Sequence, residues 1–434
     1  MTTIYDPNDS QYLDEADVRG ELTRAFNLCE GCRRCVDLCP AFPTLFSMLD
    51  RRGDRDAGWL VPSQQDRVID GCFQCGMCVV GCPHAPGVDG EDLDLPRLLI
   101  RANAMRWTSG HVSLRARATV ALAGHVEMVA AVTARGAAVA GALARSSTGS
   151  AVRRIVERVA HVPPQRLLPP VVRERFSTWF TRRVTVRLAD ARARVAVYPT
   201  CLVEYQQPDI GRDLVKVFEH NGIECTLAAG ATCCGAPYLL GGDVESFVRT
   251  AVRNVRVLSA HVHAGRDVVV AQPTCSLVIR RDYPDFVGGP DAQLLAAHVF
   301  EAAEYLMRAH AEGERVLDTN FPGDVPESIA YHAPCHLRAQ EIAVRSRDLL
   351  RLTGAPVTVV SQCAAGEEPW IGSSQHSAWS ATAADTLGEA VAGAGAVAVG
   401  DCIRANASTA SRVGAVVRHP VQVIARAYGI SEDH

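Results

Sequence analysis

The carboxyl-terminal part of the chain alternates twice between short apolar runs and helical patterns. Short continuous apolar runs are typical of strands that are buried on both faces of a parallel sheet. The helical patterns place apolar residues three or four positions apart. The expected elements are strands at 195–201, 224–234 and 268–275 with a helix at 209–221, then strands at 329–336, 357–363 and 396–402 with a helix at 340–353.

These two series correspond closely to one another. Cys201, Cys233 and Cys275 in the first match Cys335, Cys363 and Cys402 in the second. The matching cysteines are separated by roughly 130 residues, which indicates a duplicated α/β unit. Each cysteine follows a strand, and sites in open α/β sheets lie beyond the carboxyl ends of the strands. The sequence therefore predicts one site in each copy.

The amino-terminal part has a different pattern. Residues 93–106 are expected to form a helix, and residues 43–66 a polar insertion. The apolar stripe of this helix comprises Leu93, Leu95, Leu98, Leu99 and Met105.

Residues 111–184 are rich in Ala, Val, Arg and Gly and contain no cysteine. Part of this stretch, 119–144, has the composition of amphipathic helices. His125, Glu127 and Arg135 interrupt it, so it is not expected to span a membrane. Two alternatives remain: a helical linker packed on its neighbours, or an interfacial helix that docks on a membrane or a partner subunit.

The composition is that of an ordinary globular chain, with 48% hydrophobic and 21% charged residues among 434. A net charge of −4 without a Lys or Arg run argues against nucleic acid as the main partner. The first twenty residues are polar and lack the apolar core of a secretory signal, so a cytoplasmic location is expected. Sixteen cysteines in a reducing compartment indicate metal or redox chemistry. Cys225 lies outside the cysteine patterns and is expected to be a core thiol.

Two cysteine runs, at 29–40 and 72–83, share the spacing C-x2-C-x2-C-x3-C-P. In two-cluster ferredoxins the first three thiolates of such a run bind one [4Fe-4S] cluster and the fourth binds the other. The spacing therefore predicts two clusters. Their expected ligands are Cys29, Cys32, Cys35 and Cys82 for the first, and Cys72, Cys75, Cys78 and Cys39 for the second. Disulfides and tetrahedral zinc are weaker explanations of two identical four-cysteine runs.

In the first α/β unit the adjacent pair Cys233 and Cys234 precedes Gly235 and Pro237. This pattern resembles the cysteine-rich CCG domain of the heterodisulfide reductases and of the iron-sulfur subunit of anaerobic glycerol-3-phosphate dehydrogenase. The order of the whole chain, two ferredoxin runs and then two CCG-type repeats, is similar to that family and to the glycolate oxidase iron-sulfur subunits.

The chain departs from the family pattern at three positions. Gln272 stands where the first repeat would begin its closing C-x2-C, and Ala364 and Val399 replace cysteines of the second repeat. Four thiolates remain in the first repeat, enough for one [4Fe-4S] cluster, and Gly235 suits the turn that the adjacent pair requires. These four are Cys201, Cys233, Cys234 and Cys275.

The second repeat retains Cys335, Cys363 and Cys402. Three thiolates could hold a [3Fe-4S] cluster or a cubane with an outside ligand such as His336 or a substrate sulfur. The alternative is an empty site in a scaffold. His332 and His419 are expected to be structural. No dinucleotide or P-loop fingerprint is present, so a nucleotide site of the chain's own is not expected.

The sequence thus predicts an α+β multidomain protein: a helical two-cluster ferredoxin-like domain (1–108), a helical linker or docking segment (109–190), and two duplicated α/β CCG-type repeats (191–325 and 326–434). The second repeat is the degenerate one.

The resemblance implies an electron-transfer subunit that is not expected to turn over substrate alone. It would carry electrons from a flavin-containing dehydrogenase of the 2-hydroxy acid or glycerol-3-phosphate class toward a quinone or other acceptor. Peripheral association with the inner face of the membrane is compatible with this role. Two other hypotheses are a heterodisulfide-reductase-like catalytic subunit and a non-catalytic assembly or membrane-docking module.

Overall fold

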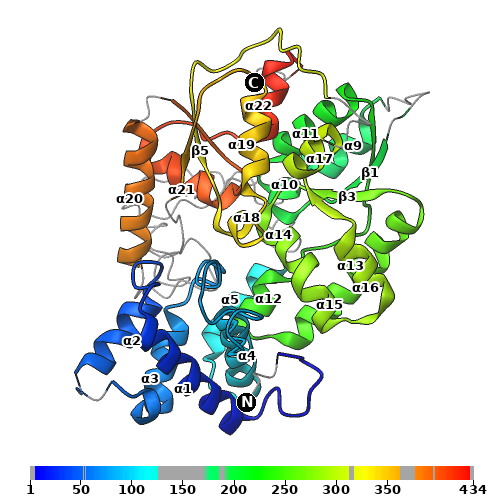
Figure 1. Cartoon of the computed structure of the whole chain (residues 1–434). Helices are drawn as coiled ribbons and strands as arrows, with labels where there is room; N and C mark the ends of the chain where they lie inside the picture. The colour runs from blue at the N-terminus through cyan, green and yellow to red at the C-terminus, as the bar shows by residue number, and fades with distance from the viewer. Residues whose placement is uncertain are drawn as a thin grey trace, which may run out of the picture. The chain divides into compact units, whose positions relative to one another are not determined.

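The computed structural model is shown in Figure 1. It forms two compact units. The first comprises Met1–Gly124, Gly235–Val248 and Ala365–Ala383, and the second His125–Cys234, Arg249–Ala364 and Ala384–His434. The structure describes residues 5–51, 53, 55–125, 172, 174–184, 191, 193–311, 317–361, 377–393 and 396–430.

The cysteine-rich part of the first unit is helical. Its longest helix, α1, begins after Asp14, whose carboxylate accepts a hydrogen bond from the backbone N–H of Asp17, and acidic residues in its first turn favour the helix dipole. It ends at Arg33, which has a left-handed backbone conformation. The elements are α1 (Glu15–Cys32), α2 (Ala41–Asp50), the 3-10 helix η1 (Ala57–Trp59), α3 (Pro62–Asp70), α4 (Leu95–Thr108) and α5 (Leu114–Gly124).

Helix α4 confirms the expected helix at 93–106, displaced by two residues, and its apolar stripe is buried in the core of this unit. The expectation of a polar insertion at 43–66 is wrong. Leu45, Phe46 and Leu49 of α2 are buried in the same core because they share one face of an amphipathic helix.

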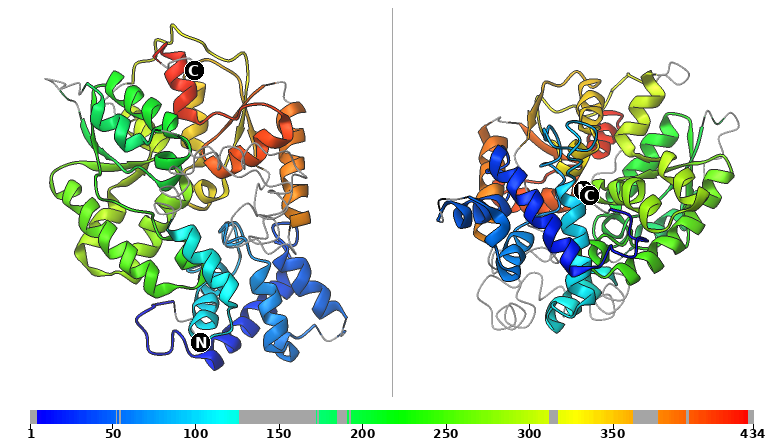
Figure 2. Two further views of the ribbon diagram at one scale, coloured as in Figure 1. Left: turned by 180° about the vertical axis from the view of Figure 1, so that it is seen from behind. Right: turned by 60° about the horizontal axis from the view of Figure 1, so that its bottom comes forward.

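The second unit contains two parallel sheets. In Figures 1 and 2 the first is green and the second runs from yellow to red. The strand order is β2-β1-β3-β4 in one sheet and β6-β5-β7 in the other, so the first strand of each sheet lies between the next two. In register, Val195 pairs with Cys225 and Asp267, and Ile329 pairs with Val357 and Val397. The strands are β1 (Ala193–Val197), β2 (Ile223–Leu227), β3 (Asp267–Val270), β4 (Val299–Glu301), β5 (Ile329–His332), β6 (Val357–Val360) and β7 (Val397–Gly400).

The strands alternate with helices, as the sequence predicts. The strands are shorter than expected, because β1, β3, β5 and β7 end before the cysteines at 201, 275, 335 and 402, and β4 was not predicted. The helices from residue 176 onward are α9 (Phe176–Arg182), α10 (Cys201–Tyr205), α11 (Pro208–His220), α12 (Ala236–Gly241), α13 (Val244–His263), α14 (Pro273–Leu277), the π-helix η2 (Val278–Asp282), α15 (Tyr283–Phe286), α16 (Gly289–Ala297), α17 (Ala302–Ala311), α18 (Cys335–Ala339), α19 (Ala343–Arg351), α20 (Ser377–Gly393), α21 (Ile403–Val413) and α22 (Pro420–Ala427).

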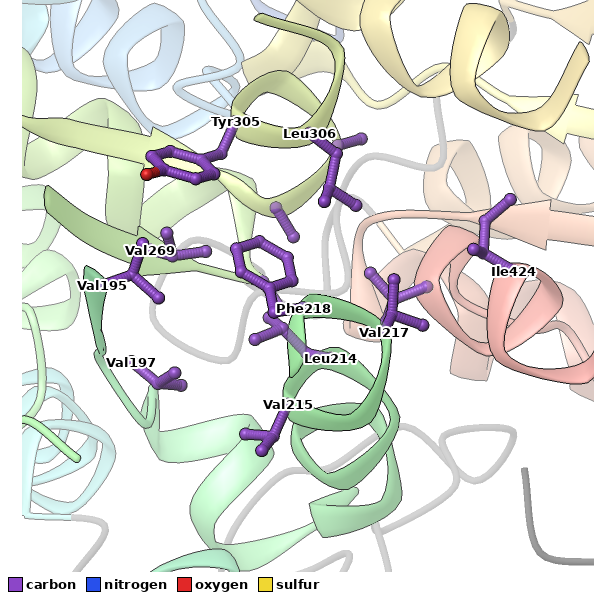
Figure 3. Close-up of a cluster of buried hydrophobic side chains, with 14 of the residues drawn as sticks. Val195, Val197, Leu214, Val215, Val217, Phe218, Val269, Tyr305, Leu306 and Ile424 are labelled. Atoms are coloured by element: carbon purple, nitrogen blue, oxygen red, sulfur yellow. The ribbon is translucent and has the colours of Figure 1, made fainter. Parts of the chain in front are cut away.

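The main core of the second unit is built on α11 (Figure 3). Leu214, Val217 and Phe218 lie on the buried face of this helix, as its amphipathic sequence predicts. Phe218 stacks on Tyr305 with ring centroids 5.7 Å apart. Ile424 of α22, a helix that follows β7, belongs to the same core. The core therefore contains helices connected to both sheets.

Much of the segment at 109–190 falls outside the described residues, including most of the amphipathic stretch at 119–144. The parts that are described include α5 and α9. Among the described helices, none is both long and apolar enough to cross a bilayer.

Candidate iron-sulfur sites

The two ferredoxin-type runs share a left-handed residue directly after their second cysteine. Cys29 and Cys32 lie in the last turn of α1, and Arg33 after them has φ +53°. Gly76, at the same place in the second run, has φ +73°. Arg33 is held in this conformation by ion pairs. Its Nη2 lies 2.6 Å from a carboxylate oxygen of Glu30 and 2.5 Å from a carboxylate oxygen of Asp50.

The four thiols assigned to the first cluster are close enough to interact electrostatically. The pKa of Cys29 is raised by burial and then by Cys35, Cys82 and Cys32. The same effects raise the pKa of Cys35 to about 11. The positive charge of Arg34 acts in the opposite direction and lowers the pKa of Cys35 and of Cys82. The Arg34 Nη1 donates to the backbone oxygen of Gly81 at 3.3 Å.

The four thiols assigned to the second cluster also lie close to one another. Burial raises the pKa of Cys78 well above its usual value, and Cys72, Cys75, Cys39 and Cys35 raise it further. The pKa of Cys39 is raised to about 12, chiefly by burial and then by Cys75. The fourth cysteine of the first run thus lies beside the first three of the second run.

A small cavity is lined by all four of these second-set thiols together with apolar groups such as Phe42 and Phe73. Thiols in this setting are held protonated by burial and by mutual repulsion of their thiolates. A cationic iron core would reverse that balance, because metal coordination deprotonates thiols. The residues therefore fit an iron-sulfur cluster.

Among the described residues, no group of three or more His, Cys, Asp or Glu side chains is arranged to ligate a single metal ion. In a cubane each thiolate binds a different iron, so the four sulfurs surround the core instead of converging on one point.

A third set of thiols lies beyond the strands of the first sheet. Cys201 begins α10, Cys233 and Cys234 follow β2, and Cys275 lies in α14. The pKa of Cys275 is raised to about 11: a hydrogen bond with Cys234 lowers it, but burial and the nearby thiols of Cys201 and Cys233 outweigh that effect. These four predicted ligands are therefore brought together.

The turn that carries the adjacent pair is held by buried polar groups. Gly235 has φ +86°, a left-handed conformation that suits the turn expected after the adjacent pair. The Asn254 Nδ2 donates to the backbone oxygen of Cys233 at 2.9 Å, and the Tyr283 hydroxyl donates to that of Cys234 at 3.0 Å. Asn254 was not predicted, because a single polar residue on a long amphipathic helix gives no signal of its role.

The sites of the two α/β units lie next to each other through their loops. The Gln272 Nε2 donates to the Cys402 Sγ at 3.7 Å. The Thr274 Oγ1 lies 2.9 Å from the His336 Nδ1, next to Cys335 at the start of α18. The Gln272 side chain thus contacts a cysteine that follows a strand of the second sheet.

The remaining predicted residues have varied outcomes. Cys363 and Ala364 lie outside the described residues. Val399 is buried on β7 opposite Tyr331, in a hydrophobic core. Cys225 is buried in the main core, as predicted.

Buried acidic groups near the second site were also not predicted. The Asp401 carboxylate accepts hydrogen bonds from the hydroxyls of Tyr331 and Ser346, each at 2.7 Å. Burial raises its pKa to about 6. Glu301 accepts from the Ser276 hydroxyl at 2.6 Å. Sequence spacing gives no signal for this network because its members come from separate elements.

Comparison with known proteins agrees with these sites. A 4Fe-4S dicluster domain model matches residues 22–91, and a cysteine-rich domain model matches residues 195–280. One subunit of the anaerobic glycerol-3-phosphate dehydrogenase of Escherichia coli K12 is 25% identical over 336 residues, which cover 69% of this chain and 83% of the relative. The chain is a homologue of that dehydrogenase subunit.

Two other relatives match shorter parts. A subunit of the fumarate reductase (CoM/CoB) of Methanothermobacter marburgensis is 26% identical over 36% of this chain and 29% of its own length. Lactate utilization protein A of Exiguobacterium is 30% identical over 33% of this chain and 57% of its own length. The glycerol-3-phosphate dehydrogenase and fumarate reductase relatives are named as subunits of oxidoreductases. The residues matched by the 4Fe-4S dicluster domain model include both ferredoxin-type runs.

Proposed function

We propose that the chain is the iron-sulfur electron-transfer subunit of an oxidoreductase complex. The observation that carries this proposal is the presence of three sets of four close thiols that are buried or half-buried, two in the ferredoxin-type runs and one after the first sheet. A series of clusters within one chain provides a route for electrons rather than a site for organic chemistry. The homology to a dehydrogenase subunit supports the same role.

The proposed ligands follow the neighbouring thiols. Cys29, Cys32, Cys35 and Cys82 would hold one [4Fe-4S] cluster, and Cys72, Cys75, Cys78 and Cys39 a second. Cys201, Cys233, Cys234 and Cys275 would hold a third.

We also propose that the second sheet is a degenerate copy of the first α/β unit. The matching strand orders, with the first strand between the next two, support a duplication. Gln272 and Val399 occupy places where the full pattern has cysteines, so a complete site would need all of Cys335, Cys363 and Cys402 with a further ligand such as His336.

The protein's own groups tune and insulate the clusters. An iron-sulfur cluster accepts and releases one electron at a time, with a potential set by nearby charge, hydrogen bonds and solvent exposure. Arg34 near Cys82 places a cation at the first set, whereas the second set is enclosed by apolar groups such as Phe42 and Phe73. Asn254 and Tyr283 keep the backbone of the third set in one conformation.

The partner would be a flavin-containing dehydrogenase, because the chain has no nucleotide fingerprint of its own. Homologues named for glycerol 3-phosphate and lactate support a substrate of the glycerol-3-phosphate or 2-hydroxy acid class. Electrons would pass to a quinone or another acceptor, with the complex in the cytoplasm or at the inner face of the membrane. The proposal includes four segments: a ferredoxin-like domain that ends at 108, a linker or docking segment that ends at 190, a first repeat that ends at 325, and a second repeat after it.

This function can be tested on the complex isolated anaerobically from cells that produce the tagged chain. Flavin content is measured, and then glycerol 3-phosphate, lactate and glycolate are added separately while the reduced-cluster paramagnetic resonance signal is recorded. We expect flavin to be present and one substrate class to reduce the clusters. Dithionite provides the fully reduced reference. A chain that reduces organic disulfides on its own, without a flavoprotein, would contradict the proposal in favour of heterodisulfide-reductase-like catalysis.

A further inference from the structure

A buried carboxylate, that of Glu301, lies next to the segment that carries Cys275 of the third thiol set. Glu301 is the last residue of β4, and it is only 3% exposed. Its Oε1 accepts from the hydroxyl of Ser276 at 2.6 Å, and Ser276 follows Cys275 in α14. A hydrogen bond with Cys234 lowers the pKa of Cys275, whereas burial, the neighbouring thiols and the charge of Glu301 raise it. Glu301 therefore acts electrostatically on the third set.

The guanidinium group in this region is bound to a different carboxylate. The Arg280 Nη2 lies 2.5 Å from a carboxylate oxygen of Glu304, and its Nη1 donates to the Oε1 of Gln340 at 3.2 Å. The same Glu304 carboxylate accepts from the backbone N–H of Glu301 at 3.0 Å. Glu304 is thus the acid that Arg280 neutralises directly, and the side chain of Glu301 is left to neutral partners such as Ser276.

The hydroxyl of Ser276 is oriented toward Glu301. The Gln340 Nε2 donates to the Ser276 oxygen at 3.2 Å. The Ser276 proton has two acceptors within reach, the Glu301 Oε1 at 2.6 Å and the backbone oxygen of Pro273 at 3.0 Å. The shorter contact is the one to the charged acceptor, as expected from the greater strength of charge-assisted hydrogen bonds.

Burial and two acidic neighbours oppose a negative charge on Glu301. Burial is the largest cause that raises its pKa well above the usual value, and the hydrogen bond from Ser276 is the largest that lowers it. The adjacent strand β3 places the apolar Val270 opposite Glu301 in the sheet. The titratable and charged groups that act on Glu301 are Arg280 of η2, Glu304 of α17, Asp401 after β7, Tyr331 of β5 and Cys275 of α14.

We propose that Glu301 takes up a proton when the third cluster takes up an electron. An added electron makes the cluster more negative, and a nearby negative charge disfavours the ionised form of a carboxyl group. The coupling is reciprocal, so a proton on Glu301 makes reduction of the cluster easier. This inference rests on the proposed function, which supplies the third cluster and the electron.

The step balances in charge. The Glu301 carboxylate gains one proton from water and becomes a carboxyl group, while the cluster gains one electron from the reduced dehydrogenase partner. On reoxidation the acceptor takes the electron and the proton returns to water. The net charge of the buried region is the same before and after each transfer, which avoids the cost of an uncompensated buried charge.

The reduction potential of the third cluster, measured between about pH 6 and about pH 10, tests the proposal. Cluster-loaded protein is titrated anaerobically, and the paramagnetic resonance signal that Cys234→Ala removes is followed. We expect reduction to raise the proton affinity of Glu301 at least tenfold, so the potential should fall by about 59 mV or more across the range. Glu301→Gln keeps an acceptor for Ser276 but cannot titrate, so its potential should stay at the wild-type value of low pH.

Two further variants separate this effect from others. Glu204→Gln is the matched control, because Glu204 is a second buried carboxylate, in the same helix as Cys201, and accepts from Ser177. The fall in potential should remain in this control. Ser276→Ala keeps Glu301 and removes the hydrogen bond that lowers its pKa, so the fall should move to higher pH.

Infrared difference spectra provide a measurement that does not depend on the potential. The reduced-minus-oxidised spectrum of wild type should contain the C=O band of a newly protonated carboxyl group, and this band should shift in deuterium oxide. The band should be absent from Glu301→Gln and present in Glu204→Gln.

A wild-type potential that is independent of pH, or an equal fall in wild type and Glu301→Gln, would overturn the proposal. Loss of the fall in Glu204→Gln or Asp401→Asn, with the fall intact in Glu301→Gln, would overturn it by assigning the proton to another carboxylate. Iron content is recorded on the same samples. A missing third cluster in wild type would overturn the proposed function and this inference with it, whereas an intact third cluster with a potential independent of pH would overturn this inference alone.

Discussion

Gln272 joins the two α/β units through two hydrogen bonds at one point. Its Nε2 donates to the Cys402 Sγ at 3.7 Å, and its Oε1 accepts from the backbone N–H of Ile403 at 3.2 Å. Ile403 begins α21, so the Gln272 amide satisfies a donor that the helix itself leaves unpaired. The Gln272 side chain therefore holds the start of α21 in the neighbouring α/β unit.

Gln272→Leu should therefore destabilise the protein without removing iron. The Ile403 N–H would be buried without a partner, which costs about 1–3 kcal/mol in the free energy of unfolding. Anaerobic urea denaturation of the cluster-loaded protein measures this loss. Gln206→Leu, at a half-buried residue beyond α10, is the control and should change stability by less than about 0.5 kcal/mol. Loss of iron in Gln272→Leu would instead make Gln272 part of a cluster site.

Two helical glycines should respond to alanine in opposite directions. A Cβ at Gly211 of α11 would lie 2.6 Å from the Phe176 ring and 2.7 Å from a Val203 methyl group, so Gly211→Ala should cost about 1–3 kcal/mol. A Cβ at Gly20 of α1 meets nothing within 4 Å, so Gly20→Ala should stabilise by about 0.5–1 kcal/mol. Thermal denaturation monitored by circular dichroism checks both. A neutral Gly211→Ala would mean that α9 and α10 are not packed on α11 as described.

His419 should make stability depend on pH. Burial lowers its pKa to about 3, whereas an unfolded histidine has a pKa of about 6.5. As pH falls from 6.5 toward 3, the unfolded chain binds a proton that the folded chain does not, so stability is lost at about 1.4 kcal/mol per pH unit. The side chain also caps α22, since its Nδ1 accepts from the Val421 N–H at 3.3 Å.

His419→Asn keeps a capping side chain and removes the titration. The measurement is the difference in unfolding free energy between wild type and His419→Asn at pH 6.5 and 5.5. Burial raises the pKa of Asp401 to about 6, so Asp401 makes the folded protein more stable as pH falls through this range. This effect is the same in wild type and variant and cancels when their unfolding free energies are subtracted. We expect wild type to lose about 1 kcal/mol more than the variant over this interval. An unchanged difference would show that His419 is accessible to solvent protons in the folded state.

Arg34 should raise the reduction potential of one cluster only. Its positive charge acts on Cys35 and Cys82 of the first set and favours the reduced, more negative cluster. Arg34→Met should lower that potential by roughly 40 mV, the equivalent of about 1 kcal/mol for one electron. A redox titration followed by paramagnetic resonance measures it, with Arg51→Met as the exposed control. A uniform shift of all centres would contradict this local effect.

The sequence was most informative where chemistry and periodicity repeat. The spacing of the two runs predicted which thiols lie together, including Cys39 beside Cys75, and the apolar runs predicted the parallel strands. Both signals are local, because they depend on neighbours within a few residues. The duplicated pattern also placed Cys201 and Cys275 beyond strand ends.

The structure added what depends on distant partners. Asn254 and Tyr283, which hold the turn of the third set, are far from it in sequence. The contact between Gln272 and Cys402 spans both α/β units, and the sequence showed only that a cysteine was missing. Strand β4 has three residues, too few for a periodic signal, and the apolar residues of α2 were grouped with the polar run at 50–56 that follows them.

The central claim is that the chain holds a third cluster in addition to the ferredoxin pair. The most direct test is iron and sulfide analysis with reduced-state paramagnetic resonance of anaerobically purified wild type, Cys234→Ala and Cys225→Ala. Cys225 is a buried core thiol and serves as the control. We predict about twelve irons in wild type and in Cys225→Ala and about eight in Cys234→Ala, with one signal lost. About eight irons in all three proteins would contradict the three-cluster route.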